Sequence, residues 1–209
     1  DKFAGAVTAK LDGNASALPP LGAVSAIDHN DQAPADHAVL ERTDRNATHA
    51  WEEMAPVSVP RKAYDGIEAL DGKLYFVGGK DGSGSKNIAE RYDPATNQWE
   101  ALNPLSVARE GLSATVLNGK LYAIGGAGLS SVEIFDPQTG QWSAGTALPA
   151  TLRNAAAITV NGKILLMGGQ DTNNQEITQV LEYDPGTDQW SQKTPMGTAR
   201  HGMTLALFE

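Results

Sequence analysis

The hydrophobic pattern of this 209-residue chain consists of short apolar runs, separated by turns that are rich in glycine, asparagine and aspartate. Three such runs, at 74–77, 121–124 and 164–167, are too short for a helix, and each ends at a pair of glycines. No helical periodicity of apolar residues accompanies them. The pattern therefore predicts buried β-strands.

A two-residue turn precedes each of these runs. Its sequence is Asp71-Gly72 in the first case and Asn-Gly, at 118–119 and 161–162, in the other two. This composition suits a tight hairpin, because both central residues of such a turn take positive φ. A strand is therefore expected on each side of every turn.

Paired glycines at 78–79, 125–126 and 168–169 close the three runs. A glycine pair at the end of a strand most simply indicates close approach of a neighbouring backbone, since a Cβ atom there would clash. A phosphate-binding loop is the alternative, but no helix start and no lysine-serine signature follows the glycines.

A second hairpin is encoded after each glycine pair by an aromatic residue, an Asp-Pro turn and a tryptophan. The aromatic pairs are Tyr92 with Trp99, Phe135 with Trp142, and Tyr183 with Trp190. Facing strands would bring the two rings of each pair together in the core.

These landmarks recur in the same order in three copies, at 70–99, 117–142 and 160–190. Two hairpins per copy make a four-stranded antiparallel sheet, and a repeat of about 45 residues is the size of a propeller blade. In the double glycine, the aromatic residue and the tryptophan at their offsets, residues 38–209 resemble the kelch-repeat family. The resemblance implies an all-β fold: a kelch-type β-propeller of four-stranded antiparallel blades.

The repeats divide the chain into a leader and a propeller. We predict an irregular leader or a degenerate blade over 1–36 and the propeller over 37–209. Its repeats lie at about 61–108, 109–152 and 153–199, while 38–55 resemble the outer half of a blade and 200–209 the first strand of a further or closing blade. The propeller is thus partial or small, and three interpretations stay open: a ring closed on four blades, part of a larger ring, or a ring completed by other copies.

Composition narrows the classes of partner. The formal net charge of −9 and the pI of about 4.9 argue against nucleic-acid binding, which draws much of its affinity from a basic surface. Cysteine is absent, which excludes disulfides and thiolate metal sites, and neither a metal nor a cofactor is predicted. No apolar run approaches the length of a membrane span. The compartment stays open, although the start at Asp1 without methionine would suit an extracellular or periplasmic protein as well as a fragment.

The resemblance also places one arginine of each unit near the rim of a central channel. A ring of guanidinium groups suits carboxylate or phosphate ligands through paired planar hydrogen bonds. The predicted ligand-binding residues are Arg61, Arg109, Arg153 and Arg200, with His201, Lys80, Asp81, Gln170 and Asp171 close to the same rim. The alternative is that the arginines are structural and pair with carboxylates and carbonyls of neighbouring blades.

The favoured function is a non-catalytic binding module that presents propeller loops to a protein or glycan partner. No catalytic residue is predicted, because no pair of carboxylates stands outside the repeat and His201 is the one histidine expected near the channel. Two alternatives stay open. One is a carbohydrate-active enzyme, a sialic-acid-type epimerase or lyase that holds an acidic sugar with the arginine ring. The other is a structural subunit that forms homo-oligomers through open blade edges.

Overall fold

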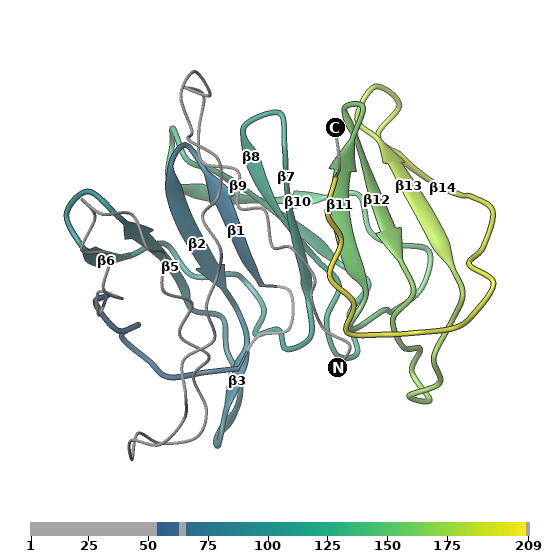
Figure 1. The fold of residues 1–209 in the computed structure, drawn as a ribbon, viewed down its shortest axis with the longest axis horizontal. Helices are drawn as coiled ribbons and strands as arrows, with labels where there is room; N and C mark the ends of the chain where they lie inside the picture. The colour runs from purple at the N-terminus through teal and green to yellow at the C-terminus, as the bar shows by residue number, and fades with distance from the viewer. Residues whose placement is uncertain (1–53, 63–65, 208–209) are drawn as a thin grey trace, which may run out of the picture. The chain divides into compact units, whose positions relative to one another are not determined.

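The computed structural model describes residues 54–62 and 66–207, which belong to one compact unit, Met54–Glu209. The predictions made for 1–36, and for all but the last residues of 38–55, lie outside the described residues. Within the described part, every regular element is a β-strand (Figure 1).

Three four-stranded antiparallel sheets follow one another along the chain, and we call them blades 1, 2 and 3. Blade 1 contains β1 (Ile67–Leu70), β2 (Lys73–Val77), β5 (Ala89–Asp93) and β6 (Gln98–Ala101). Blade 2 contains β7 (Ser113–Leu117), β8 (Lys120–Ile124), β9 (Val132–Asp136) and β10 (Gln141–Gly145). Blade 3 contains β11 (Ala156–Val160), β12 (Lys163–Met167), β13 (Val180–Asp184) and β14 (Gln189–Gln192). A small hairpin, β3 (Lys80–Asp81) with β4 (Gly84–Ser85), extends the loop that follows β2.

The two turns of each repeat adopt the predicted conformations. Asp71 and Gly72 have φ values of 50° and 71°, and both Asn-Gly turns lie within a few degrees of these. This is the left-handed pair that a two-residue hairpin requires. In the second turn the Asp93 carboxylate accepts a hydrogen bond from the Ala95 amide at 2.9 Å, and Asn97 then takes a φ of 53°.

The aromatic pairs meet as expected. Tyr92 and Trp99 lie directly opposite each other on β5 and β6, with ring centroids 5.2 Å apart, and blades 2 and 3 repeat the arrangement at 5.1 and 5.2 Å. Each tryptophan also donates its indole N–H to the chain that enters the blade: to Ala55 O in blade 1, and to Asn103 O and Thr146 O in the next two. The N–H of each half-buried indole thereby has an acceptor, and the blade is bonded to its incoming segment.

Close backbone approach explains the paired glycines. A Cβ atom on Gly125 would lie 2.5 Å from Leu152 O, closer than real Cβ atoms come to any neighbour, and Gly78 and Gly168 are equally confined. The second glycine of each pair donates its N–H to the start of the next unit: Gly79 to Arg109 O, Gly126 to Leu152 O and Gly169 to Arg200 O, at 2.8 to 2.9 Å. The prediction of backbone contact at these positions is confirmed.

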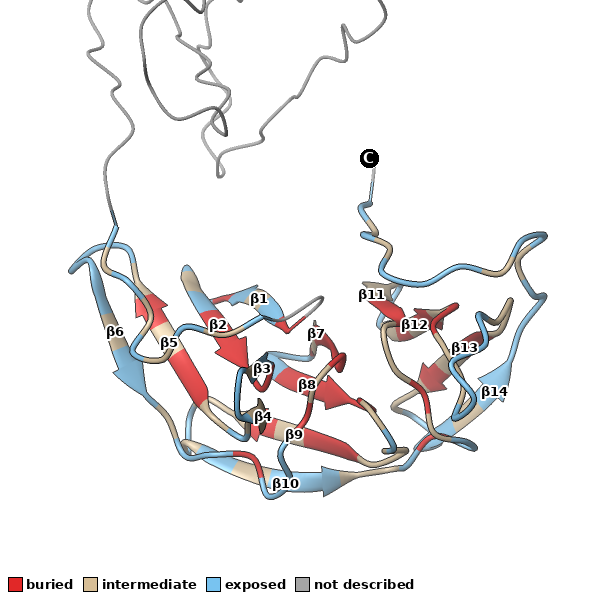
Figure 2. Ribbon diagram, turned by 90° about the horizontal axis from the view of Figure 1, so that it is seen from below, coloured by how far each residue is buried: buried red, intermediate tan, exposed pale blue. Residues whose placement is uncertain are grey.

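Two apolar clusters lie between successive blades. One joins blades 1 and 2 and includes Tyr75 and Phe135, and the other joins blades 2 and 3 and includes Tyr122 and Tyr183. The inner strand β7 contacts both β1 and β11. Figure 2 shows that burial concentrates on the middle strands, whereas the outer strands β6, β10 and β14 are mostly exposed.

The strand predicted over 200–209 is not formed in its described part, 200–207. Gly202 donates its N–H to Asn154 O at 2.9 Å, which fixes the start of this segment beside blade 3. The Arg200 carbonyl also accepts the Gly169 N–H at 2.9 Å. A strand needs a ladder of successive bonds to one partner strand, and these two bonds go to different segments. Among the described residues, no helix is long and apolar enough to cross a membrane.

Candidate functional site: a pocket where the units meet

Two of the predicted arginines are buried anchors within their own blades. The Arg109 side chain is fully buried and donates to Glu133 Oε1 at 2.8 Å, to Gly125 O at 2.8 Å and to Ser131 O at 2.8 Å. Arg61 does the same in blade 1, with an ion pair to Glu90 and a 2.8 Å bond to Gly78 O. These guanidinium groups hold the third strand of the blade to the glycine pair.

The partner carboxylates remain charged although they are buried. Burial acts to raise the pKa of Glu133, but the N–H of Ser106 at 2.8 Å and the Arg109 guanidinium outweigh it, so the pKa is lowered. In blade 1, burial is likewise outweighed by Ser58 and Arg61, and the pKa of Glu90 is lowered. Each pair is therefore an ion pair at neutral pH.

Blade 3 replaces this ion pair with two leucines. The carbonyl that receives the glycine N–H belongs to Arg109 in blade 2 but to Leu152 in blade 3, so Leu152 occupies the anchor position. Leu181 occupies the position of Glu133 on the third strand, and both leucines are buried in the same apolar cluster. The spacing of the arginines in the sequence predicts that Arg153 is equivalent to Arg109. The hydrogen bonds show instead that Leu152, one residue earlier, is equivalent to Arg109.

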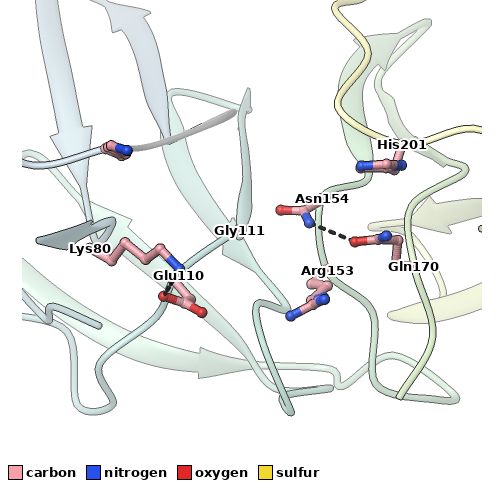
Figure 3. Close-up of a pocket in the computed structure, with 8 residues that line it drawn as sticks. Lys80, Glu110, Gly111, Arg153, Asn154, Gln170 and His201 are labelled. Atoms are coloured by element: carbon pink, nitrogen blue, oxygen red, sulfur yellow. Dashed lines mark hydrogen bonds and ion pairs between the residues drawn. The ribbon is translucent and has the colours of Figure 1, made fainter. Parts of the chain in front are cut away.

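The residue after each anchor faces a shared cavity of about 230 Å³, which we call the mouth pocket. This position is filled by Lys62, Glu110, Arg153 and His201. Reciprocal backbone bonds show the equivalence: Lys62 pairs with Lys80, and Arg153 pairs with Gln170, which is the residue that follows the glycine pair in each case. Figure 3 labels Lys80, Glu110, Arg153, Gln170 and His201 around the pocket, with Gly111 and Asn154 between them.

Polar contacts organise the lining. Lys80 Nζ lies 3.2 Å from Glu110 Oε2, and Asn154 Nδ2 donates to Gln170 Oε1 at 2.9 Å. His201 Nδ1 lies 2.8 Å from Glu176 Oε1. In contrast, the ion pairs between described residues include none formed by Lys62 or Arg153.

Arg153 itself is only partly satisfied. Its Nη2 donates to the side-chain oxygen of Asn174, while its Nε is buried and has no hydrogen-bond partner among the described residues. The Oδ1 atom of Asn154 is in the same condition, packed against Gly111. Unpaired buried polar atoms are uncommon, because each costs about 1–3 kcal/mol.

The structure brings together four of the nine predicted ligand-binding residues. Those that line the mouth pocket are Arg153, His201, Lys80 and Gln170. Arg61 and Arg109 lie in their ion pairs, and Arg200 is exposed with its carbonyl bonded to Gly169. Sequence reasoning missed Lys62, Glu110 and Asn154, although the signal was present as the residue that follows each recurring arginine.

The two predicted aspartates shape their loops. Asp81 accepts the Ser83 N–H at 2.7 Å and pairs with Lys86 at 2.9 Å, and these contacts, Lys86 foremost, lower its pKa to about 2. Asp171 accepts the N–H groups of Asn173 and Gln175 at 2.8 and 2.9 Å. Within 54–62 and 66–207, no group of three or more histidine, aspartate or glutamate side chains could hold a metal ion.

Comparison with known proteins decides the family. The model of the KLHDC2/KLHL20/DRC7 Kelch-repeats domain matches residues 27–208. The chain belongs to the kelch-repeat family. Its blades are therefore kelch blades, and the described part is three blades of an all-β propeller that the described residues leave open.

Individual relatives agree with this assignment. The chain is 33% identical over 92 residues to Kelch repeat and BTB domain-containing protein 12 of Danio rerio, covering 40% of this chain and 15% of that protein. It is 40% identical over 78 residues to human Kelch-like protein 33, covering 37% and 14%. These matches span only about a seventh of the relatives' length.

A solved structure supports the fold. "Structure of YjhT" superposes with a TM-score of 0.63 at 23% identity, covering 76% of this chain and 59% of that chain. At this identity the likeness shows the kelch fold alone.

Proposed function

We propose that this kelch propeller is a non-catalytic binding module whose mouth pocket docks an exposed segment of a protein partner. The proposal is carried by one observation: a single repeat position, the residue after the anchor, supplies Lys62, Glu110, Arg153 and His201 to one cavity. In blades 1 and 2 the anchor arginines form buried ion pairs that hold the blade together. The residues beside them have no such structural role and can contact a ligand.

The variety of side chains at this position supports the same conclusion. A position whose backbone geometry the blade fixes keeps one residue type, as the glycine pairs do in each of the three copies. The residue after the anchor is instead a lysine, an acid, an arginine and a histidine in four successive units. The fold therefore does not determine the residue type at this position. A ligand that makes a different contact with each unit would account for the variety.

The lining favours a protein segment over a glycan and binding over catalysis. Lysine, arginine, amide and backbone groups suit the side chains and main chain of a peptide. Among the described residues, no phenylalanine, tyrosine or tryptophan on which a sugar could stack lines the pocket. Glu110 is the one carboxylate that the described residues contribute to the lining, and it is paired with Lys80. A second carboxylate, as in the paired acid and base of many hydrolases and epimerases, has no counterpart among these described lining residues.

A display experiment tests this proposal. A random peptide library is selected on the protein, and the binding of enriched peptides is compared with a variant, Lys62→Glu with Lys80→Glu, that reverses two charges of the pocket. We expect binding to fall by roughly tenfold or more, which corresponds to about 1.4 kcal/mol. The control is Lys120→Glu with Lys193→Glu, which reverses two half-exposed lysines outside the pocket. Equal binding to both variants would contradict the proposal.

A further inference from the structure

Arg153 reaches the mouth pocket because blade 3 has lost its buried ion pair. In blades 1 and 2 the arginine lies one residue earlier, at the anchor, where a glutamate on the third strand neutralises it. In blade 3 the anchor is Leu152, and Leu181 stands where the other two blades have their glutamate. An arginine at position 152 would therefore have no buried carboxylate to pair with. The guanidinium of blade 3 stands instead at the next position, in the lining of the pocket.

The pocket carries positive charge on an acidic protein. Among the described residues, its charged lining consists of the cations Lys62, Lys80 and Arg153 and the carboxylate of Glu110, apart from His201. The whole chain has a formal net charge of −9. A concave site whose charge is opposite in sign to that of its surroundings focuses the field and attracts a ligand group of matching charge. Here the matching group is an anion.

Arg153 is better placed to receive that anion than Arg61 or Arg109, whose guanidinium groups are buried in ion pairs. Arg109 would have to break its contact with Glu133 in the interior, whereas Arg153 is held by the amide oxygen of Asn174, an exposed residue. A neutral amide is a weaker acceptor than a carboxylate or phosphate, because hydrogen bonds to a charged acceptor are about twice as strong. An incoming anion can therefore replace Asn174.

We infer that Arg153 is the specificity-determining residue of the mouth pocket and that the pocket recognises an oxyanion, a carboxylate or a phosphate, on its ligand. Lys62, which has no carboxylate partner among the described residues, is the second cation that faces this group. The planar fork of Arg153 can meet two oxygens of the ligand at once, which a lysine cannot do. The inference rests on the proposed role of the pocket as a binding site and adds which chemical group of the ligand the pocket binds.

The test uses two small probes, sodium glutarate and sodium phosphate, each titrated at ionic strength matched with sodium chloride. The backbone amide resonances of Gly111, Asn154 and Gln170, which line the pocket, are followed by ¹H–¹⁵N NMR in the parent protein, in Arg153→Gln and in the control Lys120→Gln. We expect saturable shifts in the parent and the control, and an affinity at least roughly tenfold weaker in Arg153→Gln. Stronger saturation by glutarate or by phosphate tells which oxyanion the site prefers.

Two outcomes would overturn the inference. Shifts that grow linearly without saturation indicate general ionic effects, and equal affinity in Arg153→Gln indicates that another group holds the anion. The peptide selection separates this inference from the proposed function. If enriched peptides need Lys62 and Lys80 but lack acidic residues and bind Arg153→Gln unchanged, the pocket is a binding site and the oxyanion assignment is wrong. If anions bind Arg153 but no peptide depends on the pocket, the proposed docking function fails alone.

Discussion

At the scale of single residues, the structure separates two roles that arginine plays in this repeat. Arg61 and Arg109 are buried and fully engaged, whereas Arg153 lines a cavity and has an unpaired Nε. The sequence shows the recurrence of arginine, but a shift of one residue is invisible in it because the surrounding spacing also varies. Only the hydrogen bonds from the glycine pairs reveal which residue is the anchor.

The anchor pair of blade 2 yields a stability prediction. Glu133→Leu leaves the Arg109 guanidinium buried without its counter-charge, and we expect the free energy of unfolding to fall by about 3–5 kcal/mol. The double variant Arg109→Leu with Glu133→Leu copies the leucine pair of blade 3, so it should recover part of that loss. Urea denaturation of the two variants and the parent measures both effects. A double variant less stable than the single one would show that the two side chains are not coupled.

The same pairs predict a dependence of stability on acid. The pKa values of Glu90 and Glu133 are lowered in the folded state, so each pair stabilises the protein above the unfolded glutamate pKa of about 4.3. This stabilisation is lost as the pH falls through the lowered folded values. We expect the free energy of unfolding to drop below about pH 4.3, and to drop less steeply in the double leucine variant. Parallel slopes for both proteins would contradict this assignment.

At the scale of the blade, the sequence predicts the elements well because each landmark has one physical cause. The Asp-Gly and Asn-Gly turns demand positive φ, the glycine pairs demand close backbone approach, and the tryptophan needs a partner ring and an acceptor. All three are found in each described blade. The strand predicted over 200–209 is not formed over 200–207, since resemblance to a first strand does not supply a second strand to pair with.

Two glycine variants test the close approach of neighbouring units. Gly125 and Gly119 both have positive φ, but a Cβ atom at 125 would lie 2.5 Å from Leu152 O whereas one at 119 would meet nothing within 4 Å. Gly119→Ala should therefore cost only backbone strain, about 1–2 kcal/mol. Gly125→Ala should cost clearly more, because blades 2 and 3 must also separate locally. Thermal denaturation of the pair measures the difference, and equal losses would refute the role of Gly125 in blade contact.

At the scale of the whole molecule, the units cooperate to build one pocket from equivalent positions. The fold and the family could be predicted from the sequence, because repeated landmarks fix both the blade and its order along the chain. The composition of the pocket could be predicted only in part. Lys62, Glu110 and Asn154 each follow a recurring arginine, but their convergence on one cavity depends on how successive blades pack. Recognition residues at such positions become visible only when the blades are seen together.

The central claim, that ligands bind where the units meet, is tested most directly by hydrogen exchange of the protein with and without a peptide selected on it. We expect the bound peptide to slow amide exchange near the pocket, in the segments 61–62, 79–80, 109–111, 153–154, 169–170 and 200–202. Protection confined to the outer strands β6, β10 and β14 would contradict it, because the partner would then bind a blade edge and leave the mouth pocket free.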